Sequence, residues 1–301
     1  MPRHDNRAPN QLRNVTFERG FYANAPGRVL VRAGNTVVLC TATAQNKPTH
    51  LPFFPLTIEY REKSYAAGKI PGGFFKREGR PGEKEILSAR LTDRPLRPLF
   101  PDGYMHETQV ACFILSADQE NDADVLAMLG ASVALNMSDI PFNDHVASVR
   151  VGRVQGNWIW NPTFQQLEDS DMDLVVAGTQ DAILMVEGGA LEIPEDEILQ
   201  GIEFAHEGIR ELIAIQQELL DGHSVPDMEW SPVEPEAALK ERVDGLALAR
   251  VQEILSLPDK QERQQAMAAL KEDVITTLKD EDDAWSEHEK DVGVVLRAIE
   301  K

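Results

Sequence analysis

The sequence predicts an α+β domain of mixed sheets packed with helices, followed by a small all-α domain. β-branched and partly alternating runs dominate residues 15–63, as in half-buried strands. Further strand-like runs then alternate with helical patterns, up to a long amphipathic helix after Pro194. Beyond residue 236 the chain carries no convincing strand pattern. We therefore expect a first domain over 1–222, a linker over 223–235 and a helical domain over 236–301.

A β-hairpin and one more strand account for the N-terminal runs. VLVRAGNTVVLCTAT, which starts at Val29, is interrupted by Gly34-Asn35, a pair that favours a tight hairpin turn. PLTIEYREK, starting at Pro55, predicts another strand. Residues 64–82 hold five glycines and two prolines among basic and aromatic side chains, so we expect a loop there.

A helix, a strand and a second helix are expected after this loop. The first helix spans about residues 83–96 and is ended by two nearby prolines. TQVACFILSA, residues 108–117, is a continuous apolar run, which indicates a strand buried on both faces. DVLAMLGASVALNMS then predicts a helix of small residues, capped by Asn121 or Asp122.

The rest of the chain predicts more strands and then helices only. Strand patterns cover 146–160, 172–179 and 182–187. The acids that follow Pro194 suit the first turn of a helix, because they complement its macrodipole. HSVPDMEWSPVEPE contains three prolines and is typical of a linker. Beyond it, we expect three or four helices with breaks at Gly245, Pro258 and the acidic run at 280–283.

Composition predicts a cytoplasmic protein. No run of about 18 or more apolar residues occurs, and the N-terminus lacks the apolar segment of a secretory signal. The two cysteines, Cys40 and Cys112, lie in apolar runs and are expected to be buried thiols in a reducing cytosol. Fifty acids against thirty bases give a net charge of −20, which taken globally disfavours nucleic-acid binding.

One segment reverses that charge. Residues 61–97, called the basic segment below, hold ten bases against five acids, a net of +5. Inside it, KIPGGFFKREGRPGEKE places Phe74 and Phe75 beside cations in a glycine-rich loop. Exposed rings next to phosphate-neutralising charges suit single-stranded nucleic acid of any sequence. Two alternatives remain open, in which the rings anchor the loop to the body or the loop binds a protein. The candidate RNA-binding residues are Phe74, Phe75, Lys76, Arg77 and Arg80.

Three further arginines form a possible phosphate-binding stripe. Arg90, Arg94 and Arg97 are spaced by four and three, so they share one helical face. Asp93 is expected to lie beside this stripe rather than within it. Guanidinium groups without an acidic partner suit bidentate phosphate contacts. The alternative is that acids from other segments pair with them.

The chain resembles bacterial polynucleotide phosphorylase over nearly its whole length. The resemblance rests on FFKREGRP followed by ILSARLTDRPLRPLFPDGY, and on IPFNDHVASVRVG, NPT and DLVVAGTQDAILMVEG. It implies an RNase PH-type first domain and an all-α domain that ends near the start of a second RNase PH-type copy. The loop that holds Phe74, Phe75, Lys76 and Arg77 is called the aromatic–basic loop below. The resemblance also implies that three copies of this loop form a constriction that binds the RNA 3′ tail. Lys76 stands where the family often has arginine.

The family's activity is 3′→5′ phosphorolysis, which converts RNA and inorganic phosphate to nucleoside diphosphates with Mg²⁺. The resemblance thus implies single-stranded RNA as ligand, a homotrimer, and RNA-degradation partners such as RNase E or a helicase, without membrane attachment. In the family's second copy, two aspartates and a lysine serve the chemistry. Here Asp173 matches one aspartate, whereas Leu167 and Val175 stand at the other two positions.

The sequence therefore predicts an RNase PH-type unit that binds RNA but does not cleave it. The segment Asn121-Asp122-Ala-Asp124 lies where the active copy has a serine-rich phosphate turn, and two acids there would repel phosphate or occupy its site. We expect no catalytic residue in this chain and no bound metal, with Mg²⁺ used by the full-length family enzyme. The alternatives are a stand-alone RNA-binding or ring-assembly module and a protein-binding α+β domain.

Overall fold

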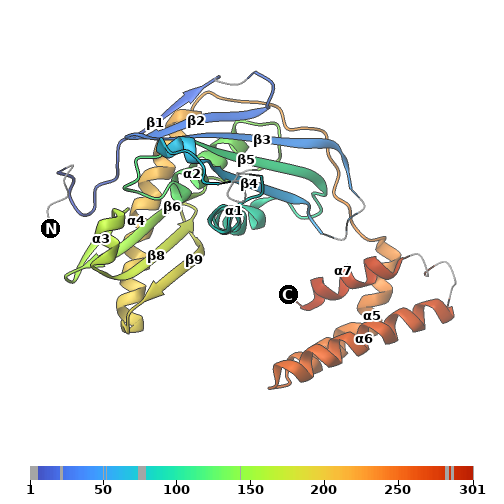
Figure 1. Cartoon of the computed structure of the whole chain (residues 1–301). Helices are drawn as coiled ribbons and strands as arrows, with labels where there is room; N and C mark the ends of the chain where they lie inside the picture. The colour runs from blue at the N-terminus through green and yellow to red at the C-terminus, as the bar shows by residue number, and fades with distance from the viewer. Residues whose placement is uncertain are drawn as a thin grey trace. The chain divides into compact units, whose positions relative to one another are not determined.

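The chain folds into two compact units, Met1–Ser231 and Pro232–Lys301. Strands and helices build the first unit, whereas the second contains helices (Figure 1). This confirms the expected α+β fold followed by a helical region. The structure, a computed structural model, describes residues 6–20, 23–49, 51, 53–73, 79–142, 144–281, 285 and 288–300.

A five-stranded mixed sheet forms one half of the first unit. Its order is β1-β2-β3-β5-β4, and only the pair β4–β5 is parallel. The predicted hairpin is confirmed, because β2 and β3 are joined by a turn in which Gly34 has a φ of +61°. The strands are β1 (Val15–Arg19), β2 (Gly27–Ala33), β3 (Thr36–Pro48), β4 (Leu56–Glu62) and β5 (His106–Ser116).

Strand β5 corrects one expectation. The prediction of a strand buried on both faces is wrong in part, since Gln109 and Phe113 are exposed. Helix α2 covers one face of the sheet. On the other face, Leu30, Val37 and Leu39 form a small buried cluster, with Leu115 packed against it. The apolar run within the strand, Val110 to Leu115, therefore has one face that is only partly covered.

A four-stranded antiparallel sheet forms the other half of the unit. Its order is β7-β6-β8-β9, and helix α4 (Glu195–Leu220) packs against β6 and β8. The indole of Trp160 donates to the carbonyl of Phe204 in α4 at 2.8 Å, which fixes helix and sheet together. The elements are β6 (Ala147–Val154), β7 (Asn157–Trp160), the short helix α3 (Phe164–Glu168), β8 (Ser170–Gly178) and β9 (Ile183–Ala190).

Helix α2 (Asp124–Asn136) is the centre of the first unit. It packs against β2, β3 and β5 of one sheet and against β6 of the other, so Asp124 to Leu135 are all buried. The buried amide of Gln216 in α4 accepts from the Ser132 hydroxyl at 2.9 Å and donates to the Val146 carbonyl at 2.8 Å. The backbone N–H of Val146 donates to Ser132 Oγ at 2.9 Å. This closed network joins α2, α4 and the residue before β6.

The start of α2 differs from the prediction. Neither Asn121 nor Asp122 caps the helix, because the N-cap position is Ala123 and has no side-chain cap. The Asn121 amide instead donates to the carbonyls of Asn161 and Pro162. Its side chain therefore ties the approach to α2 to the end of β7 rather than to the helix.

Helix α1 spans Glu83–Leu96, as expected from the sequence, and it lies against β4. Pro95 does not end this helix but lies within its last turn, and a 3₁₀ turn at Arg97–Leu99 follows. In the described part of the expected loop before α1, residues Ser64–Ala67 form a 3₁₀ turn.

The segment after α4 returns to the body of the first unit. Met228 donates its N–H to the Asp139 carbonyl at 2.7 Å, and the Trp230 ring meets the Tyr104 ring edge-on at 5.5 Å between centroids. Because of these contacts, the structure assigns residues 223–231 to the first unit. They lie within the range expected to be a linker.

Three helices form the second unit among the residues described: α5 (Ala237–Leu255), α6 (Lys260–Glu281) and α7 (Glu289–Glu300). The expected break at Gly245 is wrong, because α5 runs through it. Buried residues on both sides, Val243 and Ala247 among them, form one continuous stripe that packs on the other helices. No helix in the described part of the chain is long and apolar enough to cross a membrane.

Candidate RNA-binding segment and ionic cluster

The basic segment contains helix α1 and the loop before it. Phe74, Phe75, Lys76 and Arg77 lie outside the described residues. Arg80, just before α1, is exposed. The predicted contact of this loop with RNA therefore stays a prediction.

A groove of about 590 Å³ runs between α1 and the edge strand β4. Its lining includes Ile86, Ala89 and Arg90 of α1 and Ile58 and Arg61 of β4. Arg90 is exposed and forms no ion pair with any residue that the structure describes. Of the three predicted stripe arginines, it is the one whose charge stays available to an anion within this part of the chain.

The other two stripe arginines are paired with acids. The sequence predicts Asp93 to lie beside the stripe rather than within it, which would leave the stripe without an acidic partner. This is wrong for Arg97, which donates to both carboxylate oxygens of Asp93, at 2.7 and 3.0 Å. Arg97 also donates to the carbonyls of Phe54 and Leu56. Arg94 pairs with Glu187 of β9. Much of the charge of these two arginines is therefore neutralised within the fold.

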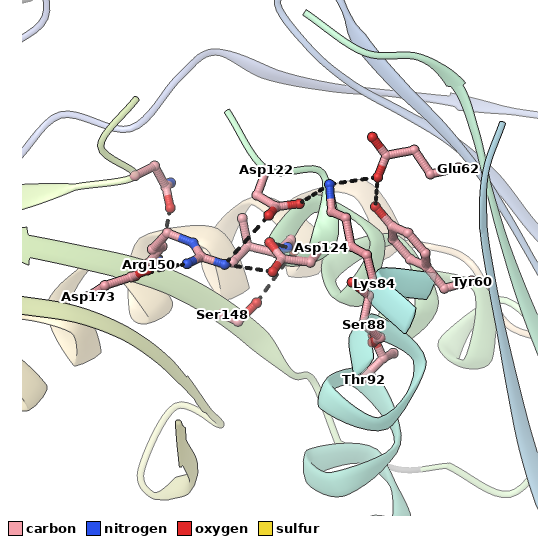
Figure 2. Close-up of polar contacts among 12 residues, drawn as sticks. Tyr60, Glu62, Lys84, Ser88, Thr92, Asp122, Asp124, Ser148, Arg150 and Asp173 are labelled. Carbon is pink, nitrogen blue, oxygen red and sulfur yellow. Dashed lines mark hydrogen bonds and ion pairs between the residues drawn. The ribbon is translucent and has the colours of Figure 1, made fainter. Parts of the chain in front are cut away.

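On another side of α1 lies a group of charged side chains, called the ionic cluster below (Figure 2). Lys84 lies between Glu62 and Asp122, with nitrogen–oxygen distances of 2.9 and 3.2 Å. The Tyr60 hydroxyl donates to Glu62 at 2.9 Å. The cluster comprises Tyr60, Glu62, Lys84, Asp122, Asp124, Arg150 and Asp173.

Arg150 of β6 lies close to all three aspartates of the cluster. One terminal nitrogen donates to Asp124 at 2.7 Å, and the other donates to both oxygens of Asp173, at 2.8 and 2.9 Å. Asp122 lies 3.9 Å from the first of these nitrogens. Figure 2 shows the guanidinium enclosed by these carboxylates, which come from the start of α2 and from β8.

Burial shapes the titration of the cluster. It raises the pKa of Asp124, and the repulsion of Asp122 adds to this, while the attraction of Arg150 opposes it. Burial alone would lower the pKa of Arg150, but Asp124, Asp173 and Asp122 together raise it. For Lys84, burial is likewise outweighed by Asp122 and Glu62, so its pKa is raised. Both cations are therefore held firmly in their charged form.

The cluster borders a pocket of about 420 Å³, whose lining includes Lys84, Asp124, Arg150, Asp173 and Val175. Val175, at the position where the resemblance would require lysine, is buried. In the ionic cluster four acids meet two cations, and the three aspartates face Arg150. Within the described ranges, no three His, Cys, Asp or Glu side chains are arranged to hold a metal ion. The described residues of this cluster therefore do not fit a Mg²⁺ ion.

Sequence reasoning found the aspartates of this cluster but missed Arg150 and Lys84. A signal for Arg150 was present, because ASVRVGRV places a charge inside a run of buried valines. A charge at such a position needs a partner in the fold. Lys84 carried no comparable signal, since it lies near the start of a helix rich in charges.

Three family models match the chain. The model described as "3' exoribonuclease family, domain 1" matches residues 11–141, and "domain 2" of the same family matches residues 144–208. "Polyribonucleotide nucleotidyltransferase, RNA binding domain" matches residues 238–301. The first two models together cover both sheets of the first unit, and the third covers the helices of the second.

Curated relatives point to the same family. A polyribonucleotide nucleotidyltransferase of Gemmatimonas aurantiaca is 50% identical over 96% of this chain and 39% of its own length. Those of Thermomicrobium roseum and Halalkalibacterium halodurans are 52% and 49% identical, over 87% and 90% of this chain. They are covered over 34% and 39% of their own length, so the chain spans well under half of these relatives.

A solved structure supports the fold. A chain of the Archaeoglobus fulgidus exosome, solved with RNA bound to the active site, matches with a TM-score of 0.56 at 20% identity. The match covers 70% of this chain and 91% of the exosome chain. This match supports the fold alone. The family models and the relatives show that this chain belongs to the polyribonucleotide nucleotidyltransferase family, of which it carries the N-terminal RNase PH-type region and the helical region after it.

Proposed function

We propose that this chain is the N-terminal part of a 3′→5′ phosphorolytic exoribonuclease of mRNA degradation. In this proposal it binds RNA and helps to assemble a ring, whereas the chemistry, with Mg²⁺ and inorganic phosphate, belongs to the family's second RNase PH-type unit. Family membership supports the reaction class. The proposal also includes a homotrimer, a cytoplasmic location and contacts with RNA-degradation partners such as RNase E or a helicase.

The observation that carries the proposal is the contrast between two groups of cations around α1. Arg80 and Arg90 are exposed beside the aromatic–basic loop and the groove, where an extended anion could reach them. Lys84 and Arg150 are neutralised inside the ionic cluster. The free charge of the segment thus favours binding a nucleic-acid backbone, and the closed cluster disfavours phosphate chemistry in the same unit.

RNA retention tests the binding part of the proposal. A fluorescent oligo(A) is titrated with the 301-residue chain and with the double variant Phe75→Ala/Arg77→Ala, and fluorescence anisotropy is measured. Loss of one stacking ring and one phosphate contact should weaken binding about ten- to hundredfold. The dependence of log Kd on log salt concentration should also become shallower, because fewer counterions are released.

A matched control distinguishes the effect of changing this loop from the effect of removing a ring and a positive charge anywhere on the surface. Phe164→Ala/Arg210→Ala removes one exposed ring and one exposed cation elsewhere in the first unit. This control should bind RNA as the unchanged chain does. Equal retention by all three chains would contradict the assigned RNA-binding role of the loop. Release of nucleoside diphosphates from poly(A) by the 301-residue chain, with phosphate and Mg²⁺, would contradict the proposed absence of chemistry.

A further inference from the structure

The carboxylate of Asp124 occupies the position that an anion would take at the start of α2. One of its oxygens accepts from the backbone N–H of Val125 at 2.7 Å, and the other accepts from Arg150 at 2.7 Å. A phosphate ion bound at a helix N-terminus beside an arginine would use the same two donors. Only 6% of the Asp124 side chain is exposed, so the contact is enclosed.

Asp173 completes the enclosure from β8. It accepts from the remaining terminal nitrogen of Arg150 through both oxygens, at 2.8 and 2.9 Å, so the two oxygens share a single donor nitrogen. The Nε of Arg150 is buried and has no hydrogen-bond partner among the residues described. Both terminal nitrogens of Arg150, a residue that lines the pocket, are engaged by carboxylates of the chain itself.

We propose that Asp124 and Asp173 are internal ligands of Arg150 that keep inorganic phosphate out of this pocket. The two aspartates thus occupy the hydrogen-bond donors at the start of α2 and on Arg150 that could otherwise bind an anion. This deepens the proposed function, on which it rests for the relevance of phosphate. In this proposal, phosphate does not bind because two side chains occupy Arg150. The pocket beside them is large enough for phosphate, with a volume of about 420 Å³.

Both internal ligands are held on rigid elements. Asp124 starts the buried helix α2, and Asp173 lies within β8, which pairs with β6, the strand that carries Arg150. Burial raises the pKa of Asp124, which reflects the cost of desolvating a carboxylate that the fold holds in place. Asparagine at either position keeps the size of the side chain and removes its charge.

Phosphate binding by the 301-residue chain tests the proposal. Thermal unfolding and ³¹P NMR titration are run with increasing inorganic phosphate, at an ionic strength held constant with sodium chloride. The unchanged chain should respond to phosphate no more than to chloride. Asp124→Asn/Asp173→Asn should bind phosphate at least about tenfold more tightly, with a Tm that rises with phosphate. Adding Arg150→Gln should abolish the gain.

Two further variants keep the test decisive. Asp173→Asn leaves Asp124 in place and changes a side chain that is 45% exposed, so it provides the test if variants at the buried Asp124 do not fold. It should bind phosphate more tightly than the unchanged chain. Asp171→Asn is the matched control, because Asp171 lies on the same strand and pairs with Arg153 away from the α2 start. It should bind phosphate as the unchanged chain does.

Three results would overturn the proposal. One is phosphate binding by the unchanged chain that matches the asparagine variants, and another is a gain that persists with Arg150→Gln. The third is the absence of any gain in folded Asp173→Asn and in the folded double variant. None of these readouts involves RNA, so failure here is distinct from failure of the RNA-retention test.

Discussion

The network of Ser132, Gln216 and Val146 offers the sharpest test of how the fold positions the ionic cluster. It joins α2, which begins with Asp124, to the residue before β6, which carries Arg150. Gln216→Met keeps approximately the size of the side chain but removes both of its polar contacts. The Val146 carbonyl then loses its hydrogen bond from the amide, and the Ser132 hydroxyl loses its acceptor.

The expected cost follows from these two groups. Each buried polar group left without a partner costs about 1–3 kcal/mol. We therefore expect Gln216→Met to lower the free energy of unfolding of the first unit by about 2–5 kcal/mol. For a unit of this size, that corresponds to a fall in Tm of about 5–15 °C.

Urea unfolding followed by tryptophan fluorescence measures this change, because three of the four tryptophans (Trp158, Trp160 and Trp230) lie in the first unit. The neighbouring exposed residue provides the control, since Gln217→Met should leave stability within about 0.5 kcal/mol of the unchanged chain. Ser132→Ala combined with Gln216→Met should cost less than the sum of the single changes. A Gln216→Met chain as stable as the control would refute the reasoning.

Two more predictions concern His145 and Gly27. Burial lowers the pKa of His145, with Asp144 opposing, so the folded chain holds this proton less tightly than the unfolded chain does. Stability should therefore fall on acidification below about pH 6.5, and less steeply in His145→Gln; parallel Tm–pH profiles would contradict this. Gly27→Ala would place its Cβ 1.9 Å from the Ala134 carbonyl oxygen, so we expect a loss of about 1–3 kcal/mol or more in urea unfolding. Gly189→Ala, whose Cβ meets nothing within 4 Å, should unfold like the unchanged chain, and equal stability of the two alanine variants would contradict the clash.

Local patterns explain which parts of the fold the sequence could predict. The Gly34-Asn35 turn and the amphipathic helix after Pro194 depend on neighbouring residues, and both occur where expected. Gly245 misled the prediction because its helix is stabilised by a buried stripe on either side of it. Packing of that stripe outweighs the cost of one glycine, which is about 1 kcal/mol.

The ion pairs of the candidate site are of two kinds, those between neighbours on one helix and those between distant segments, and only the first kind can be predicted from the sequence. The pairing of Asp93 with Arg97 is an i,i+4 contact and was within reach of sequence reasoning. The partners of Arg150 were not, because Asp124 and Asp173 come from segments 26 and 23 residues away along the chain. Their meeting depends on the register between β6 and β8 and on the position of α2 between the two sheets.

The pairing of β3 with β5 has a practical consequence for chemical labelling. Cys40 and Cys112 are opposite each other in these strands, with 3.6 Å between their Sγ atoms, and both are fully buried. Burial also raises the pKa of the Cys40 thiol, which disfavours the reactive thiolate. They are the only cysteines in the chain. A single cysteine introduced at exposed Gly79 should therefore react with maleimide dyes or thiol-reactive RNA crosslinkers almost without background in the native state.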